Sequence, residues 1–186
     1  MHRIFGGRQR GITLVEVLVT MVILAIGLLG LVGLQARLQI LQSEAYQRAQ
    51  ALMLLKDMAG RIANNRNDAA AYVTGPDAPI GVGNCPTDTS TRQRADVSEW
   101  CGLLQGASEE TTAGTRVGSM VGGRGCVEEL DDGVYLVTVA WQGLAPISAP
   151  PESVACAAGD FDGGTVCVED LCRRFVTSIV RIARLT

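Results

Sequence analysis

Hydrophobic residues run almost without interruption from Ile12 to Leu34, and Glu16 is the only charged residue among these 23 positions. A helix of this length reaches roughly 34 Å, which is enough to cross the hydrocarbon core of a membrane. Basic residues precede the run and would stay cytoplasmic under the positive-inside rule. The pattern predicts a membrane-spanning helix over residues 12–34, with the rest of the chain outside the cytoplasm.

The pattern changes after Leu34 to one apolar residue in every three or four. This spacing predicts an amphipathic continuation of the same helix over residues 35–65. We expect its apolar stripe to pack against the remainder of the chain, and the poor helix formers of "ANNRND" (63–68) to end it. The stripe consists of Leu38, Leu41, Ala45, Ala49, Leu52, Leu55, Ala59 and Ile62.

Residues 66–186 have the patterning of a small globular head. "GVYLVTVAWQG" (133–143) alternates apolar and polar positions, which predicts a strand, and "RRFVTSIVRIA" (173–183) predicts a closing strand. "ADVSEWCGLL" (95–104) predicts a short helix in a segment, 64–125, that is otherwise irregular. The residues expected to face the core are Tyr135, Val137, Val139 and Trp141 of the first strand and Trp100, Leu103 and Leu104 of the helix.

All six cysteines follow the apolar run, which indicates a head in an oxidising compartment where disulfides persist. The candidate disulfide cysteines are Cys85, Cys101, Cys126, Cys156, Cys167 and Cys172. Six cysteines allow fifteen pairings, and we favour Cys85 with Cys101 as a local staple of the irregular segment. The sequence gives no basis for pairing the other four.

Composition argues against several other functions. The net charge of −3 disfavours a nucleic-acid binder, which usually has a basic face. His2, the single histidine, precedes the apolar run, so general-base and Cys-His catalysis are largely excluded and we expect neither an enzyme nor a cofactor.

The sequence contains two candidate metal sites, and its residues favour neither. Cys167 and Cys172 have no second pair of matching spacing for zinc, and an oxidising space favours their disulfide. An EF-hand loop starting at Asp160 would lack its later ligands. A loose calcium loop using Asp160, Asp162, Glu169 or Asp170 stays open, with an acidic glycine-rich turn as the preferred interpretation.

Two simple membrane segments compete for the N-terminus. A secretory signal peptide has a shorter apolar core followed by a small-residue cleavage site, and here Gln35-Ala36-Arg37-Leu38 follows. A plain signal anchor does not explain Glu16, because a carboxylate within a membrane span is costly and usually marks a function. The simpler account places Glu16 near the cytoplasmic headgroups, helped by the helix dipole.

A short basic leader that ends in Gly11, then Ile12-Thr13-Leu14-Val15-Glu16 and a long apolar run, resembles the class III signal of type IV pilins and pseudopilins. The resemblance covers residues 6–34. Ile12 replaces the usual phenylalanine, and Gly33 lies near the position of the helix-bending proline of major pilins.

The resemblance implies that residues 1–11 are a leader, which a prepilin peptidase cuts after Gly11, and that the new N-terminal Ile12 is methylated. It implies an α+β pilin fold, in which a long helix packs on a small antiparallel sheet with disulfide-pinned loops. Glu16 would neutralise the buried amine of Ile12 on a neighbouring subunit during assembly. The protein would sit in the inner membrane among its lipids, with its head in the periplasm, before joining a pilus.

The six-cysteine head, the "SEW" helix and the tryptophan-bearing strand most resemble the minor pilins within this family. The implied function is priming of pilus assembly in a tip complex with other minor pilins, the major pilin and a tip adhesin, supporting twitching motility and surface adhesion. The alternatives are a minor pseudopilin of type II secretion and a membrane-anchored extracytoplasmic binding module.

Overall fold

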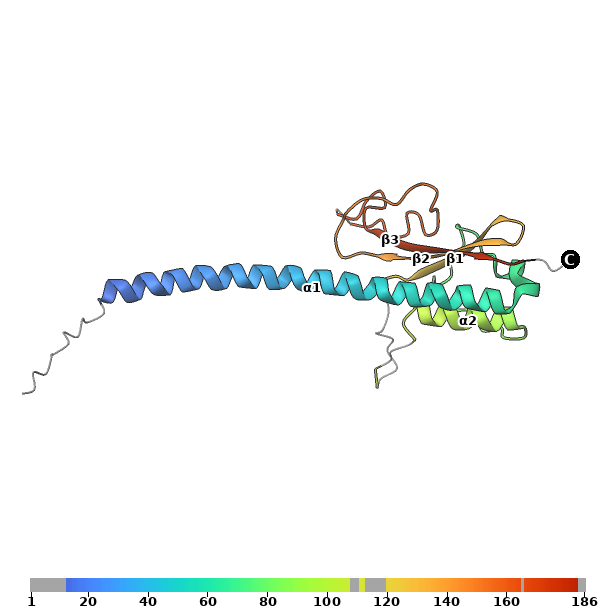
Figure 1. The fold of residues 1–186 in the computed structure, drawn as a ribbon, viewed down its shortest axis with the longest axis horizontal. Helices are drawn as coiled ribbons and strands as arrows, with labels where there is room; N and C mark the ends of the chain where they lie inside the picture. Colours follow the sequence, from blue (N-terminus) through green and yellow to red (C-terminus); the bar gives the residue numbers. More distant parts are fainter. Residues whose placement is uncertain (1–12, 108–110, 113–119, 165, 184–186) are drawn as a thin grey trace, which may run out of the picture. The chain divides into compact units, whose positions relative to one another are not determined.

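The computed structural model describes residues 13–107, 111–112, 120–164 and 166–183 of the 186-residue chain. It has α+β architecture, with a long N-terminal helix, a small antiparallel sheet and three disulfides, as the sequence predicts (Figure 1). The contacts divide the chain into two compact units, Met1–Gln42 and Ser43–Thr186. Helix α1, Leu14–Asn64, contributes to both units.

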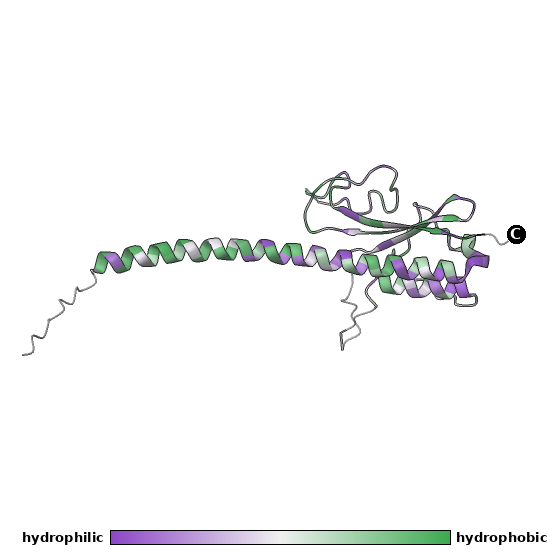
Figure 2. Ribbon diagram, viewed as in Figure 1, coloured by the Kyte–Doolittle hydropathy of each residue, from purple (hydrophilic) through white to green (hydrophobic). Residues whose placement is uncertain are grey.

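In the first unit, α1 starts at a threonine cap and is exposed throughout. The Glu16 backbone N–H donates to the backbone oxygen of Thr13 at 3.0 Å and to its hydroxyl at 3.3 Å, which satisfies a donor that a helix start leaves free. Residues 13–42 are all solvent-exposed. Figure 2 shows that this part of α1 is predominantly hydrophobic.

Three helical elements belong to the head, the unit Ser43–Thr186. The C-terminal part of α1 is followed by a 3-10 helix, η1, at Arg66–Tyr72, and by α2 at Arg92–Leu104. The Trp100 indole of α2 donates to the Leu54 carbonyl of α1 at 3.0 Å, so the two helices are directly joined. α2 begins three residues before the predicted start, because the Thr91 hydroxyl accepts from the Arg94 backbone N–H and caps the helix there.

The sheet has three antiparallel strands in the order β1-β2-β3. β2, Val134–Gln142, and β3, Arg173–Arg181, lie within the two predicted strand segments. β1, Arg124–Asp131, was not predicted, because it carries three acidic residues and little apolar alternation. Its position depends on pairing with β2 and on Gly125, where an added Cβ would lie 2.1 Å from the Trp100 ring.

The core lies between the helices and one face of the sheet. Its largest fully buried side chains include Trp100, Tyr72, Met58, Ile62 and Leu104, and the four predicted positions of β2 are buried as expected. Leu103 is half-buried rather than fully in the core.

The stripe that the sequence predicts on α1 is partly wrong. The buried residues of α1 are Gln47, Ala51, Leu55, Met58 and Ile62. Leu55 and Ile62 belong to both sets, whereas Ala45, Ala49 and Leu52 are exposed. Successive residues of an α-helix are rotated by about 100° around its axis. The predicted stripe and the buried face therefore coincide near the C-terminal end of α1 and point in different directions nearer its middle.

Loops cover part of the opposite face of the sheet, where Phe161 and Ala157 pack on Ala140. The disulfide Cys126–Cys156 ties β1 to this covering loop. Cys85–Cys101, the pairing favoured from sequence, ties the irregular segment to α2, and Cys167–Cys172 closes a short loop before β3. Disulfide-pinned loops are thus confirmed, and the pairing of the remaining four cysteines is an addition to the sequence analysis.

Candidate functional site

The N-terminal start of α1 presents Glu16 in its first helical turn. The spacing Thr13-x-x-Glu16 is that of a capping box, and an acidic side chain in this turn also interacts favourably with the positive end of the helix dipole. Glu16 is exposed, and among the described residues no side-chain hydrogen bond or ion pair of Glu16 is present. Gly11 and Ile12 lie outside the described residues.

The apolar surface that follows Glu16 is not covered by any other described part of the chain. Its large hydrophobic side chains are 43% to 77% exposed between Leu14 and Leu34. α1 is the one helix in the described part of the chain that is long and apolar enough to cross a membrane, and none of its apolar window is buried. A contiguous surface of this kind requires lipid or other apolar helices around it, so the helix is suited to membrane anchoring.

Three glycines lie in this exposed stretch, at positions 27, 30 and 33. A Cβ added at any of them would meet nothing within 4 Å. Each glycine in a helix interior costs about 1 kcal/mol relative to alanine, and no contact within the described residues offsets that cost here. Close approach of helices from other molecules is a physical use for such positions.

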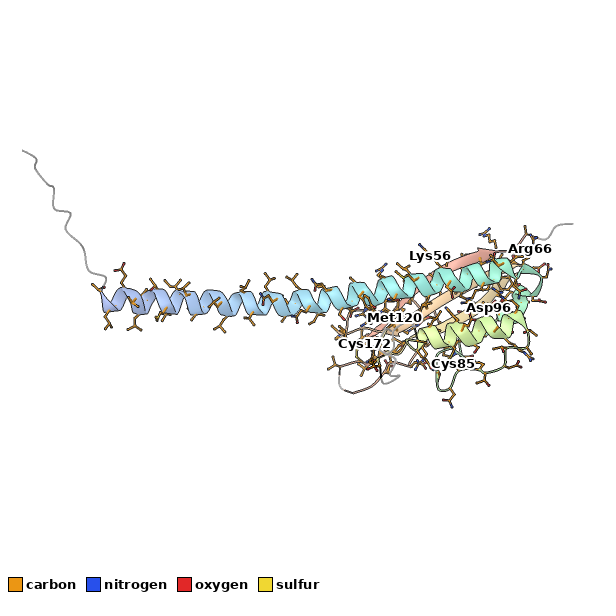
Figure 3. All side chains as sticks on the ribbon, turned by 90° about the horizontal axis from the view of Figure 1, so that it is seen from below. Lys56, Arg66, Cys85, Asp96, Met120 and Cys172 are labelled. Atoms are coloured by element: carbon orange, nitrogen blue, oxygen red, sulfur yellow. A yellow bond between two sulfur atoms is a disulfide. The ribbon has the colours of Figure 1, made fainter. Side chains whose placement is uncertain are left out.

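Asp96 forms the main electrostatic cluster of the head, between α1, η1 and α2 (Figure 3). Its carboxylate accepts from the Tyr72 hydroxyl at 2.5 Å and from the Arg61 guanidinium at 2.8 Å. Arg61 also pairs with Asp57 at 2.8 Å and with Glu99 at 2.7 Å. No sequence pattern indicates this cluster, because its partners lie up to 38 residues apart and meet only in the folded chain.

The cluster shifts the pKa of Asp96, Tyr72 and Arg61, each in a direction with a clear cause. Burial would raise the pKa of Asp96, but hydrogen bonds from Tyr72 and Arg61 outweigh it and the pKa is lowered. Burial, followed by the hydrogen bond to Asp96, raises the pKa of Tyr72 to about 12. Burial would lower the pKa of Arg61, but its hydrogen bonds to Glu99, Asp57 and Asp96 outweigh burial and raise it. The charges stabilise one another, and the cluster holds α1, η1 and α2 together.

The acidic loop weighed for calcium uses its carboxylates within the protein. Asp162 accepts the Asp170 backbone N–H at 2.8 Å, and Asp170 accepts the Gly159 backbone N–H at 2.9 Å. Asp170 also pairs with Arg173 at 3.0 Å, and Asp160 with Arg124 at 3.3 Å. No group of three potential metal ligands occurs among the described residues, and Cys167 and Cys172 are joined to each other rather than to zinc.

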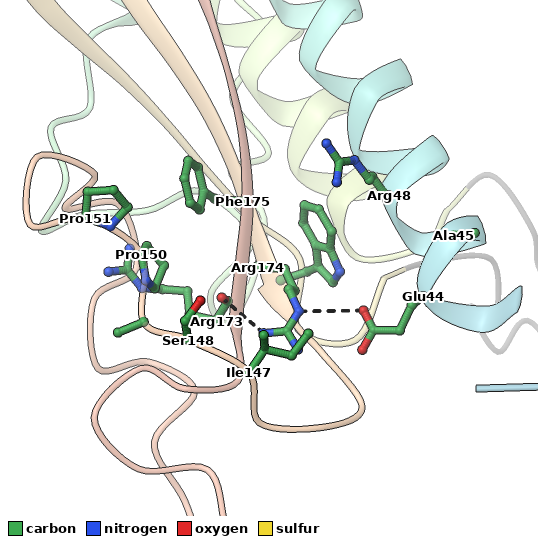
Figure 4. Close-up of a pocket in the computed structure, with 12 residues that line it drawn as sticks. Glu44, Ala45, Arg48, Ile147, Ser148, Pro150, Pro151, Arg173, Arg174 and Phe175 are labelled. Carbon is green, nitrogen blue, oxygen red and sulfur yellow. Dashed lines mark hydrogen bonds and ion pairs between the residues drawn. The ribbon is translucent and has the colours of Figure 1, made fainter. Parts of the chain in front are cut away.

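A cavity of about 490 Å³ opens on the head beside Glu44, Arg48 and Arg174. Figure 4 shows Arg48 on α1 on one side of this cavity, and Phe175, Pro150 and Pro151 on the other. Glu44 is held in place, because it accepts the Leu144 backbone N–H at 2.6 Å and lies 3.7 Å from Arg174. Sequence reasoning did not find this cavity, since its walls come from three distant segments.

Comparison with protein families gives one finding. Residues 6–32 match the model of the prokaryotic N-terminal methylation motif. Comparison with curated proteins and with solved structures gave no match.

The matched segment contains Gly11, Ile12 and Glu16, together with the start of the exposed apolar helix. This match supports a type IV pilin-like family and indicates a subunit of the type IV pilin or pseudopilin type. A signal of this class implies processing by a prepilin peptidase and assembly with other pilins. Proteins of this type are generally structural rather than enzymatic.

Proposed function

We propose that this protein is a minor pilin of the type IV pilus, most similar to PilV, which primes pilus assembly as part of a tip complex. The observation that carries the proposal is the methylation motif at residues 6–32, followed by a helix whose apolar surface is uncovered. The "SEW" segment of α2 and the six-cysteine head support the narrower similarity to PilV. Twitching motility and surface adhesion would be the downstream functions.

In this proposal Gly11 is the last leader residue and Ile12 the methylated N-terminus. Cleavage removes three arginines and no acidic residue, so the formal charge changes from −3 to −3 − 3 = −6. The new amine of Ile12 is buried when helices pack into a filament, and a buried amine requires a counter-charge. Glu16 of a neighbouring subunit supplies that charge, which accounts for a carboxylate in an otherwise apolar segment.

The proposed route starts in the inner membrane, with the N-terminus cytoplasmic and the head periplasmic, and ends in the pilus at the cell surface. Residues 12–34 would be the membrane and assembly segment, 35–65 the amphipathic part of the helix, and 66–186 the extracytoplasmic head. The partners are the prepilin peptidase, the other minor pilins, the major pilin and a tip adhesin. The disulfides of the head fit an oxidising periplasm.

Intact-mass and peptide mass spectrometry of the membrane-purified protein tests processing directly. We expect a chain that begins at methylated Ile12, and we expect a Gly11→Val variant from the same host to keep its leader. A wild-type chain that still begins at Met1 in a host with active peptidase would contradict the pilin assignment. It would support a membrane-anchored binding module instead.

Deletion of the gene separates the pilus from a type II secretion pseudopilus, which shares the leader and the helix. A minor pilin that primes assembly predicts few surface filaments and weak twitching with secretion unaffected. Loss of secretion with normal filaments would assign the protein to the pseudopilus.

A further inference from the structure

Strand β3 leaves one edge of the sheet open. The bonds Ile182 N–H to Gly133 O, at 2.8 Å, and Gly143 N–H to Cys172 O, at 2.7 Å, fix which residues of β3 bond to β2. The intervening residues then direct their backbone groups away from β2, since bonding alternates in an antiparallel pair. These residues are Phe175, Thr177, Ile179 and Arg181, and none has a backbone partner on the open side among the described residues.

The opposite edge of the same sheet is covered in its first half, at Gly125 and Val127. The Thr74 backbone N–H donates to the Val127 oxygen of β1 at 2.9 Å, and Ile80 and Gly125 exchange two backbone bonds of 2.8 and 2.9 Å. Exposed sheet edges are templates for pairing with another chain, and proteins usually cover or shorten them. Here the first half of one edge is covered, and the nine-residue edge β3 has no such cover among the described residues.

The 490 Å³ cavity lies at the start of this open edge, because Arg174 and Phe175 of β3 line it. Apolar side chains of Ile147, Pro150 and Pro151 form part of its wall (Figure 4). Hydrophobic pockets with a few directed polar groups are the usual form of a binding site. The cavity can therefore hold an apolar side chain of a segment that runs along β3.

Three hydrogen-bond donors of residues that line the cavity lack acceptors among the described residues: the Trp141 indole, the Arg173 Nε–H and the Arg48 guanidinium. Trp141 is 2% exposed, and its buried indole N–H has no partner. Arg48 is exposed and makes no ion pair or hydrogen bond within the described part of the chain, whereas Arg174 is paired with Glu44. A buried donor without an acceptor is costly, so a ligand that brings a carboxylate or carbonyl would be favoured here.

We propose that the β3 edge and this cavity form one docking site for an extended segment of another protein. The segment adds a fourth strand beside Phe175–Arg181, and places an apolar side chain and an adjacent carboxylate in the cavity beside Arg48 and Trp141. Strand addition of this kind gains affinity from backbone hydrogen bonds and specificity from side-chain pockets. Its identification as a different pilin-type subunit rests on the function proposed above.

A second copy of this chain is a poor occupant. Antiparallel pairing of two β3 edges about their midpoint, Thr177, would bring Arg181 of each chain opposite Arg173 of the other, and like charges across strands are unfavourable. Pairing of β3 with the first half of β1 of a second copy is blocked, because residues 74–80 already bond to Gly125 and Val127 there.

Within β3, which has no acidic residue, Arg173 and Arg174 are already paired with Asp170 and Glu44. Arg181 and the nearby Arg48 make no ion pair among the described residues, and these two charges favour an acidic partner segment.

Residue-resolved amide hydrogen exchange on the full-length chain in detergent tests the geometry. The probes are the other full-length pilin-type subunits of the same organism, each recognised by its own N-terminal methylation motif and added singly. We expect one subunit to slow exchange at least tenfold at Thr177, Ile179 and Arg181, with little change at the intervening residues that already bond to β2. A bound complex in which these amides still exchange as in the free chain would overturn the proposal.

Two variant pairs test the strand and the cavity separately. Ile179→Pro removes an outward N–H that β2 does not use, a change that edge strands tolerate, and Ile179→Thr keeps that N–H. Arg48→Glu reverses the free charge at the cavity, and Arg66→Glu makes the same change on an exposed arginine at the start of η1 (Figure 3). We expect Ile179→Pro and Arg48→Glu each to weaken binding at least tenfold and both controls to bind normally.

The outcomes separate this inference from the proposed function. Normal binding by Arg48→Glu, or by a folded Ile179→Pro, would overturn the docking site while a methylated Ile12 still supported a pilin. If Ile179→Pro does not fold, Arg48→Glu and the exchange pattern decide. Correct processing with no subunit bound would also overturn the docking site, whereas an unprocessed leader would overturn the proposed function.

Discussion

The N-terminal part of α1 and the head differ in whether contacts within the described chain explain their unusual residues. Between Thr13 and Gln42 every residue is exposed, and the glycines and Glu16 make no side-chain contact that accounts for their presence. In the head the glycine at 125 is required by the Trp100 ring, and the carboxylate at 96 by Arg61 and Tyr72. A residue type that is costly and unexplained within a chain indicates a use between chains.

This contrast predicts that substitutions in the first region change assembly, while substitutions in the head change stability. Most of the head's stability depends on a small core supported by three disulfides, so its unfolding is measurable by ordinary means. The N-terminal segment has no core of its own whose unfolding could be measured. The effects of substitutions there must be assayed with partner subunits present.

The largest effect is expected for Glu16→Ala. Membrane insertion should be at least as efficient as in the wild type, because a carboxylate has been removed from an apolar span. Cleavage after Gly11 should also persist, since the cut is several residues from the glutamate. Assembly should fail, because a buried amine without its counter-charge costs on the order of 3 to 5 kcal/mol.

The measurement for Glu16→Ala is co-purification of the processed protein with other minor pilins, together with a count of surface filaments. Arg37→Ala, a charge removal further along the same exposed helix, is the control and should assemble normally. Normal assembly of Glu16→Ala would leave helix capping and the dipole as the whole explanation of this residue.

Removing the disulfide between Cys126 and Cys156 should have the next largest effect. A double serine variant frees the loop that covers β1 and should lose roughly 2 to 5 kcal/mol of unfolding free energy, as small domains typically do. Chemical denaturation measures this loss. The Cys167–Cys172 disulfide has a sequence separation of only 5, so its loop is much shorter. Removing it should cost less, which makes this variant the matched control. Equal losses would contradict a dependence on loop length.

The two regions also differ in how far sequence reasoning reached. The N-terminal helix and the strands β2 and β3 follow from patterns that local periodicity reveals. β1 was missed because its place depends on β2 and on Trp100 rather than on its own alternation. The Asp96 cluster and the cavity were missed because their members meet only after the chain has folded, and no spacing signals them.

Asp96→Asn should destabilise the head by about 3 kcal/mol. The change keeps the shape of the side chain but weakens charged hydrogen bonds with Tyr72 and Arg61, each of which is worth roughly 1.5 to 3 kcal/mol. Asp57 and Glu99 continue to neutralise Arg61, which limits the loss. Thermal or urea unfolding gives the value, and Asp68→Asn, at an exposed position of η1, should have little effect.

The same cluster predicts the pH dependence of the head. Because the pKa of Asp96 is lowered on folding, its stabilisation is present above its ordinary pKa near 4 and is lost as pH falls through the lower folded value. Because the pKa of Tyr72 is raised to about 12, its contribution is present below pH 10 and is lost as pH rises from 10 to 12. Unfolding free energy measured across pH should fall at both ends, and Asp96→Asn should flatten the acid side.

Glycine replacement gives the smallest effect and the most direct comparison of the two regions. Gly125→Ala places a Cβ 2.1 Å from the Trp100 ring and 2.9 Å from a Leu104 methyl carbon, and overpacking of this kind typically costs about 1 to 3 kcal/mol. Gly30→Ala meets nothing within 4 Å and should strengthen its helix by about 1 kcal/mol. Urea unfolding of the head should detect the first change and not the second.

The informative measurement for Gly30 is therefore made with partners present. If other helices approach closely at Gly30, Gly30→Leu should reduce incorporation into filaments even though Gly30→Ala is tolerated, since the larger side chain holds the helices apart. Both variants should insert and be processed like the wild type. Full incorporation of Gly30→Leu would mean that close packing does not explain this glycine. The next hypothesis to test would be that the glycine serves to weaken the helix locally.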